Sequence, residues 1–352
     1  MTFGERLKEA RIRSRFTQEQ LGERVGVEKM SISKYESEKM FPSSQTLIAL
    51  SQALNVSPDY FFREIYVRLE NYPEFRLDKR LGPFSKRDGK QIVVRTQDAL
   101  NRYMEVLEIF QIDDTIRPDD SLRRIVRSYE EIEDLAWSIR KTWNIGSEPV
   151  GNMIALAERH GFKVIVVHGP PMFDAAVFSE EECGPVIVLR RGAPKDRQRF
   201  TLAHEIGHYF IRSGSVVYKS DDPERMANRF AAAFLMPRET FVVDVGRNRK
   251  KFLEGELCIL REKYGVSVPA LLVRMSSLHL ISEGVQKKYQ KMYDQGEIGV
   301  RPIGEAYTGT EKPFIIPNLV FRGVSEGILS EWKGRELLGE DYDEIMQCMK
   351  EA

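Results

Sequence analysis

The pentapeptide HEIGH at residues 204–208 limits what this chain can fold into more than any other part of its sequence. Residues four apart on an α-helix lie one above the other, so a helix directs the imidazoles of His204 and His208 toward one point. Two histidines at this spacing are typical zinc ligands, and Glu205 between them is placed to act as a general base on a water molecule at the metal. The apolar spacing around the motif predicts a helix over residues 195–213. The alternative is a helix that carries these three residues by chance.

A second helix supplies a candidate for the third ligand that a catalytic zinc site requires. The Asp-Pro pair at residues 222–223, with the aspartate as N-cap, predicts a helix over residues 223–236. Glu224 lies in its first turn and Asn228 one turn later on the same face. We therefore expect one Zn²⁺ per chain, held by the two histidines and Glu224, with Asn228 bonded to the outer nitrogen of a ligand histidine. The alternatives are that Glu224 only stabilises the helix dipole and that Asn228 is a surface or cap residue.

Zinc bound in this way predicts hydrolytic chemistry. The ion lowers the pKa of a water molecule to about 7, and Glu205 takes its proton and passes it to the leaving amine. The donor that stabilises the oxyanion stays open among His168, Tyr209 and Tyr218. An extended substrate is expected to pair with a strand edge at residues 186–189.

Residues 17–36 (TQEQLGERVGVEKMSISKYE) have the pattern of two short helices joined by a tight turn. Thr17 can cap the first helix with Gln20 as its capping-box partner, and Gly26 permits the left-handed turn. This is typical of a helix-turn-helix, in which the start of the second helix reads base edges in the major groove and the start of the first contacts a phosphate. The residues so placed are Glu28, Lys29, Ser31, Ser33 and Lys34 on the second helix and Gln18 on the first. A small helical bundle without a DNA role is the alternative.

Composition constrains the partners and the compartment. Lys+Arg and Asp+Glu both number 53, so any contact with nucleic acid must come from a local patch. Such a patch is present between Arg76 and Arg102, a segment that contains eight basic residues and only three aspartates. The three cysteines form no CxxC pair, which favours a reducing cytoplasm, and no apolar run approaches the roughly 20 residues that cross a bilayer, so no membrane partner is expected.

The spacing of apolar residues predicts a mostly α-helical chain with a small β-sheet, an α+β fold. Residues 1–65 are expected to form a five-helix helix-turn-helix bundle whose fourth helix is capped by Ser44, and residues 66–148 a mostly helical connector. Residues 149–284 are expected to form the metal domain, and residues 285–352 an extension of unknown fold. Other expected helices span 91–110, 119–143, 149–161 and 335–350, and two buried strands span 163–168 and 185–190.

Two stretches of this sequence resemble known families. Residues 3–62 resemble XRE (Cro/C1-type) helix-turn-helix domains, which bind double-stranded DNA, usually as dimers. Residues of about 150–275 resemble the ImmA/IrrE metallopeptidases, on the strength of RFTLAHEIGH at 199–208 and ERMANRFAAAFLMP at 224–237. The resemblance implies a minimal gluzincin-like fold, with His204, His208 and Glu224 as zinc ligands and Glu205 as catalytic base. Members of that family cleave repressor proteins, so it also implies a transcriptional repressor as the protein substrate.

The chain departs from these families in three respects. Gly22 stands where XRE domains usually carry alanine, which costs about 1 kcal/mol of helix propensity, and Glu38 stands where glycine commonly ends the second helix. The order of the two domains is the reverse of that in the radiation-response members. Two alternatives to a peptidase therefore stay open: a transcriptional regulator whose zinc site is structural or senses a ligand, and an antitoxin-like partner of a toxin.

Overall fold

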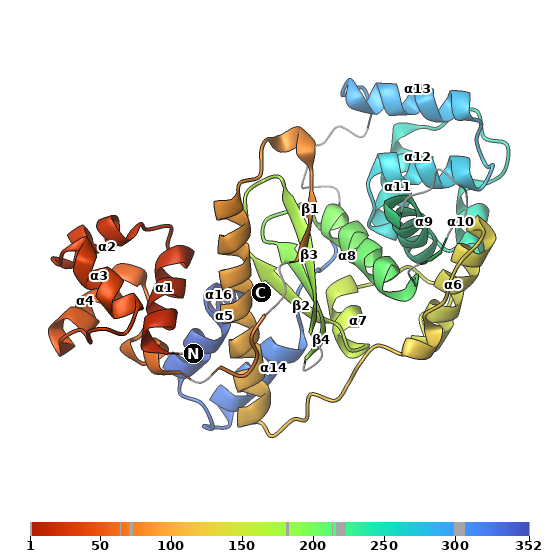
Figure 1. Cartoon of the computed structure of the whole chain (residues 1–352). Helices are drawn as coiled ribbons and strands as arrows, with labels where there is room; N and C mark the ends of the chain where they lie inside the picture. The colour runs from red at the N-terminus through yellow and green to blue at the C-terminus, as the bar shows by residue number, and fades with distance from the viewer. Residues whose placement is uncertain are drawn as a thin grey trace.

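The structure is a computed structural model, and it describes residues 2–63, 65–69, 73–180, 183–212, 214–215, 223–298 and 307–351. Figure 1 shows a helical bundle at the N-terminus, a central sheet covered by helices on both faces, and a helical lobe beyond the sheet. The last three helices return toward the N-terminal bundle. The expected mostly helical α+β fold is confirmed.

The N-terminal bundle contains the five expected helical segments. Thr17 caps the second helix in a capping box with Gln20, and Gly26 has the predicted left-handed conformation at φ 75°. The fourth helix is capped by Ser43 rather than by Ser44, because the Ser43 hydroxyl is the one that accepts from the backbone N–H of Thr46. The bounds are α1 (Phe3–Arg13), α2 (Gln18–Val25), α3 (Lys29–Glu36), α4 (Ser44–Leu54) and the 3₁₀ helix η1 (Pro58–Phe62).

Both departures from the XRE pattern have a structural role in this bundle. A Cβ atom on Gly22 would lie 2.6 Å from the carbonyl oxygen of Val27, so the bare backbone lets the turn approach α2. This close packing offsets the lower helix propensity of glycine. Glu38 has a φ of 59°, the left-handed conformation that glycine supplies elsewhere, and its Oε1 accepts from the backbone N–H of Gly4 at 3.3 Å.

The sheet has four strands in the order β1-β3-β4-β2. Strand β2 (Lys163–Val167) pairs parallel with β4 (Gly184–Arg190), which confirms the two expected strands. Strand β3 (Phe173–Glu180), antiparallel to β4, and the edge strand β1 (Glu74–Leu77), antiparallel to β3, were not expected from the sequence. The prediction that residues 186–189 offer a free edge is wrong, because β4 is paired on both sides.

Helices cover both faces of this sheet. Helix α5 (Lys86–Ile109) covers one face, where Val186 and Val188 of β4 pack with it, while Ile187 and Leu189 point to the opposite face, toward α8 (Lys195–Phe210). The segment expected to be a mostly helical connector therefore supplies one edge strand and one covering helix of the sheet.

Several expected helices have different bounds in the structure. Helix α5 begins five residues before the expected start at residue 91, because Ser85 caps it. Residues 119–143 do not form one helix, because Ser128 caps a new helix after the 3₁₀ turn η3 (Asp120–Leu122). The helix expected from Pro149 begins four residues later, where Asn152 caps it. The C-terminal helix is broken at Gly339, whose φ is 61°. The remaining bounds are η2 (Lys79–Leu81), α6 (Tyr129–Thr142), α7 (Met153–Arg159), α9 (Pro223–Leu235), α10 (Arg238–Val245), α11 (Glu254–Tyr264), α12 (Val268–Ser277), α13 (Glu283–Asp294), α14 (Ile315–Ser325), α15 (Glu331–Leu338) and α16 (Glu340–Glu351).

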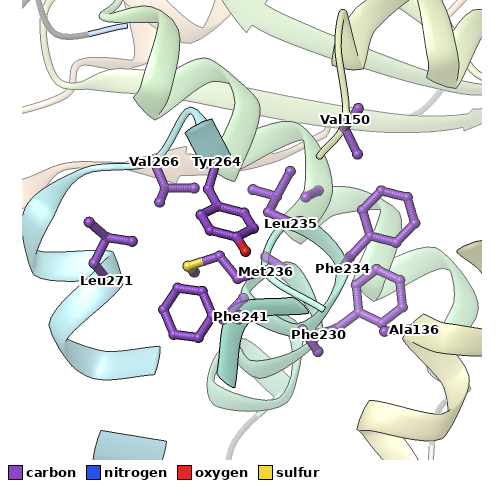
Figure 2. Close-up of a cluster of buried hydrophobic side chains, with 14 of the residues drawn as sticks. Ala136, Val150, Phe230, Phe234, Leu235, Met236, Phe241, Tyr264, Val266 and Leu271 are labelled. Carbon is purple, nitrogen blue, oxygen red and sulfur yellow. The ribbon is translucent and has the colours of Figure 1, made fainter. Parts of the chain in front are cut away.

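Helix α9 is the centre of the largest core. Figure 2 shows Phe230, Phe234 and Leu235 of α9 packed among apolar side chains of neighbouring helices, including Phe241 of α10 and Tyr264 of α11. All five of these residues are fully buried. Burial of this apolar surface fixes α9 against α8, and so fixes the two helices that carry the candidate ligands.

The C-terminal helices close the structure against α5. Ile316 and Val320 of α14 and Leu337 of α15 form a cluster with Val106 and Leu107 of α5. The hydroxyl of Ser57 in the N-terminal bundle donates to Glu336 of α15 at 3.2 Å. The C-terminal extension, whose fold the sequence did not predict, therefore connects the bundle to the helix that covers the sheet. Within the described ranges, no helix combines the length and the apolar character needed to cross a membrane.

Candidate metal centre

His204, His208 and Glu224 converge between α8 and α9. Their ligand atoms all lie within 4.8 Å of one another. Nε2 of His208 is 2.9 Å from Nε2 of His204 and 3.0 Å from Oε1 of Glu224, and Nε2 of His204 is 3.3 Å from Oε2 of Glu224. His204 is fully buried, His208 is partly exposed and Glu224 is exposed, so the site is held by a packed helix and opens to solvent on one side.

This geometry fits a zinc ion. Two ligand bonds of about 2.1 Å at a tetrahedral angle place the ligand atoms about 3.4 Å apart, slightly more than the three separations of 2.9, 3.0 and 3.3 Å found here. Two imidazoles and one carboxylate are also the donor set of catalytic zinc sites that keep a fourth position open. The three side chains of the site therefore suit zinc in both spacing and chemistry.

The protonation states suit a cation as well. Burial lowers the pKa of His204 to about 4, against the opposing effect of Glu224, so its imidazole is neutral near pH 7. Contact with His204 lowers the pKa of Glu224 to about 2 and keeps it ionised. A neutral imidazole and a carboxylate are the forms in which these groups bind metal.

Asn228 lies where the sequence predicted it. Its Oδ1 is 2.8 Å from Nδ1 of His204 and also accepts from Nη2 of Arg76 at 3.4 Å. Because a guanidinium can only donate, the Asn228 atom that Arg76 contacts is the amide oxygen, and this oxygen can only accept from His204. The proton of His204 is therefore on Nδ1, and Nε2 presents a lone pair toward His208 and Glu224.

Glu205 follows His204 on α8 and is buried, with 8% of its surface exposed. Its Oε1 lies 3.9 Å from Nη1 of Arg76. The carboxylate is thus held beside the ligand cluster, on the buried side of a site that opens to solvent at His208 and Glu224. Its role as a general base stays a prediction.

Arg76 is the residue that sequence reasoning missed at this site. It comes from β1, where Phe75 and Leu77 on either side pack on the α5 face of the sheet, so Arg76 points to the α8 face. The only sequence signal is this alternation over four residues, in a segment that reads as a basic connector.

Of the three expected oxyanion donors, the two that the structure describes have other surroundings, and the third is outside the described residues. His168 follows β2 and lines a separate cavity with Arg95 and Arg191. The hydroxyl of Tyr209 donates to Asp120 at 2.7 Å. Tyr218 lies outside the described residues, as does Asp222, the expected N-cap of α9.

The predicted DNA-contacting residues occupy different environments. Glu28, Lys29 and Lys34 are exposed on or just before α3, whereas Ser31 and Ser33 are half-buried. The side-chain amide of Gln18 donates to Glu36 at 2.8 Å, so within the bundle it joins α2 to α3.

Two regions of the chain match family models, and their positions agree with this architecture. Residues 4–67 match a helix-turn-helix domain, and residues 157–276 match the IrrE N-terminal-like domain of the peptidase M78 family. The matches are separated by the segment that contains β1 and α5.

Curated relatives match short stretches of the chain. The chain is 37% identical over 71 residues to the HTH-type transcriptional regulator ImmR of Bacillus subtilis, and 40% identical over 60 residues to repressor protein C2 of Salmonella phage P22. These matches cover 20% and 17% of this chain, and 56% and 28% of the two relatives, so the chain spans about half of the first relative's length and about a quarter of the second's.

Among solved structures, the P22 c2 repressor in complex with a synthetic operator shares 39% identity, covers 17% of this chain and 92% of its own, and has a TM-score of 0.17. As the sequence resemblance predicted, the chain joins an N-terminal helix-turn-helix domain to an IrrE N-terminal-like domain of the metallopeptidase type.

Proposed function

We propose that this protein is a DNA-binding, zinc-dependent endopeptidase that cleaves a transcriptional repressor or a related regulator. The observation that carries the proposal is the convergence of His204, His208 and Glu224, with the buried carboxylate of Glu205 beside them. A site that only stabilises a fold has no use for this additional carboxylate. The match to an IrrE N-terminal-like domain supports the same activity.

In this proposal His204, His208 and Glu224 hold one zinc ion per chain. Bound zinc supplies Lewis acidity, which lowers the pKa of a water molecule to about 7 and polarises a carbonyl group. Glu205 accepts a proton from the attacking water and later donates it to the leaving amine. Asn228 keeps the proton of His204 on Nδ1, so that Nε2 stays available as a ligand.

The proposal is tested by metal analysis and by co-expression with a transcriptional regulator encoded near the gene of this protein, as the candidate substrate. We expect about one zinc per purified chain and cleavage of that regulator during co-expression. Glu205→Gln is expected to keep its zinc and lose cleavage. The matched control is Glu239→Gln, which removes the charge of an exposed glutamate on α10. Undiminished cleavage by Glu205→Gln contradicts the assigned base.

Double-stranded DNA is the proposed second partner. The support is the helix-turn-helix match together with the relatives named as a regulator and a repressor. Lys29 and Lys34 are exposed at α3, where they can contact phosphates or base edges. A homodimer on a two-fold symmetric site would present two copies of α3 to successive major grooves.

The DNA partner is tested by titrating the promoter region of the protein's own gene at several salt concentrations. Each of Lys29→Ala and Lys34→Ala is expected to reduce the salt dependence of binding by about one counterion if the lysine contacts a phosphate. Lys287→Ala is the matched control, because Lys287 is exposed on α13 outside the helix-turn-helix domain. The assignment of α3 as the DNA-contacting helix is contradicted if the protein binds every DNA sequence with equal affinity and if the salt dependence of binding is the same in both lysine variants as in the parent.

A transcriptional regulator with a structural or ligand-sensing zinc site is the second candidate. It is favoured by the names of the two relatives, a regulator and a repressor, which match 71 and 60 residues of this chain. The same set of variants separates the two functions. A pure regulator keeps repression in Glu205→Gln and cleaves no neighbouring regulator in any form.

A further inference from the structure

Arg76 reaches the metal centre from a part of the chain that lies outside both family matches, which cover residues 4–67 and 157–276. Strand β1 holds it there by antiparallel pairing with β3, in which Arg76 is opposite Ala175. The neighbouring Phe75 anchors the strand on the other face of the sheet, with its ring 4.9 Å from that of Phe84. The position of Arg76 is therefore fixed by the sheet.

The hydrogen-bonding capacity of the Arg76 guanidinium is only partly satisfied by the protein. Nη2 donates to Oδ1 of Asn228 at 3.4 Å. Nη1 lies 3.9 Å from Oε1 of Glu205 and 3.9 Å from Oε2 of Glu224, which is beyond hydrogen-bond distance. Within the described part of the chain, this nitrogen is buried and has no hydrogen-bond partner.

A buried donor without a partner is unfavourable, and a ligand that supplies the missing acceptor removes this cost. Here Nη1 lies between Glu205, the proposed base, and Glu224, a proposed metal ligand. Hydrolysis of a peptide bond places negative charge on the carbonyl oxygen in this same space, next to both groups. A fixed cation in a water-poor site stabilises such a charge much better than it would in bulk water.

We propose that Arg76 is a catalytic residue that donates from Nη1 to the carbonyl oxygen of the scissile bond as negative charge develops there. The inference rests on the proposed peptidase function and supplies the oxyanion donor that Tyr209 and His168 do not supply in this structure. The segment between the two matched domains is then part of the catalytic centre, not only a connector.

The first test compares the cleavage kinetics of Arg76→Gln and Arg76→Lys with those of the full-length parent. Loss of an oxyanion donor lowers kcat by about 10²- to 10³-fold, and we expect that loss in Arg76→Gln with KM changed far less. Arg76→Lys keeps the positive charge and is expected to recover part of kcat. Arg80→Gln is the matched control, since its side chain is 85% exposed and lies four residues further along the chain.

The second test measures ligand binding in the absence of turnover. Inorganic phosphate, an anion with a tetrahedral array of oxygens, is titrated calorimetrically into zinc-loaded Glu205→Gln protein and into the Glu205→Gln, Arg76→Gln double variant. We expect equal zinc content in both proteins and at least a tenfold weaker phosphate affinity in the double variant. The Glu205→Gln, Arg80→Gln double variant is expected to bind phosphate as tightly as the Glu205→Gln single variant does.

The outcomes separate this inference from the proposed function. If Glu205→Gln abolishes cleavage while Arg76→Gln cleaves as well as the parent, the peptidase stands and the role of Arg76 is overturned. If Arg76→Gln loses its zinc, Arg76 serves only to hold Asn228 and His204, and the catalytic role is again overturned. If no form cleaves any regulator, the proposed peptidase function fails. Unchanged phosphate affinity in the Arg76 double variant then rejects the anion-binding role of Arg76 as well.

Discussion

Oδ1 of Asn228 lies 2.8 Å from Nδ1 of His204, and this contact determines which nitrogen of His204 can bind a metal. We expect Asn228→Leu to weaken zinc binding by about 10- to 100-fold, because the imidazole loses both its fixed tautomer and its fixed orientation. Competition with a chromophoric chelator measures the change.

The matched variant is Asn228→Asp, which keeps an oxygen acceptor for His204 and for Arg76. It is expected to retain zinc within about tenfold of the parent. Equal zinc affinity in Asn228→Leu and the parent would show that packing alone orients His204.

Gly207, inside the metal motif, is required for the close approach of α8 and α9. A Cβ atom at this position would lie 2.8 Å from Cδ1 of Phe230, a fully buried residue of α9. We expect Gly207→Ala to lower the free energy of unfolding by about 1–3 kcal/mol through overpacking, and to weaken zinc binding because α9 carries Glu224. Urea unfolding and chelator competition measure the two effects.

The control for this variant is Gly255→Ala on α11, where an added Cβ meets no atom within 4 Å. Removal of glycine flexibility from a helix is expected to stabilise the protein there by about 0.5–1 kcal/mol. A stabilising effect of Gly207→Ala as well would contradict the packing of the two ligand helices described above.

The ligand cluster was predictable because its determinants are local. The spacing of His204 and His208 places both on one helix face, and Glu224 follows a helix start in the sequence. The two helices then need only a short connection and a common core to bring the three side chains together. The structure brings them within 4.8 Å of one another.

Strand β1 and Arg76 were not predictable because their placement depends on distant partners. A four-residue strand has too little alternation to stand out, and its partner β3 follows about a hundred residues later in the chain. The assignment of residues 186–189 as an edge failed for the same reason, since strand order is decided by tertiary packing and not by local sequence.

Arg199 of α8 forms an ion pair with Glu311, and both side chains are fully buried. Oε2 of Glu311 also accepts from the backbone N–H groups of Met153 and Ile154, so this carboxylate joins the segment before α14 to α7 and α8. We expect Glu311→Ala to lower the free energy of unfolding by about 3–5 kcal/mol, because it leaves a buried guanidinium without its counterion. Urea unfolding checks this value.

Two comparisons identify the cause of that loss. Replacing both Arg199 and Glu311 with methionine is expected to destabilise the protein less than Glu311→Ala, because no unpaired charge remains buried. Glu326→Ala removes the partner of Arg322 in an exposed pair, where the change is expected to stay below about 1 kcal/mol. Equal effects of Glu311→Ala and Glu326→Ala would show that the buried pair contributes no more than an exposed one.

Glu158, on α7, makes the stability of the protein depend on pH. Burial raises its pKa to about 7 from 4.5, even though it accepts hydrogen bonds from the backbone N–H groups of Phe314 and Ile315 at 2.8 and 3.4 Å. Because the pKa is higher in the folded state, the folded protein binds this proton more tightly than the unfolded chain does. The contribution of Glu158 is therefore most favourable below about pH 4.5, and it decreases as the pH rises to about 7.

We expect Glu158→Gln to gain stability relative to the parent across that window, by on the order of 3 kcal/mol at most. Urea unfolding of both proteins at pH 5, 6, 7 and 8, with equal zinc content, measures the difference, and Glu108→Gln, an exposed position on α5, is the matched control. A difference that stays constant over this range would mean that Glu158 titrates alike in the folded and unfolded states, and that its burial between α7 and α14 has no effect on its ionisation.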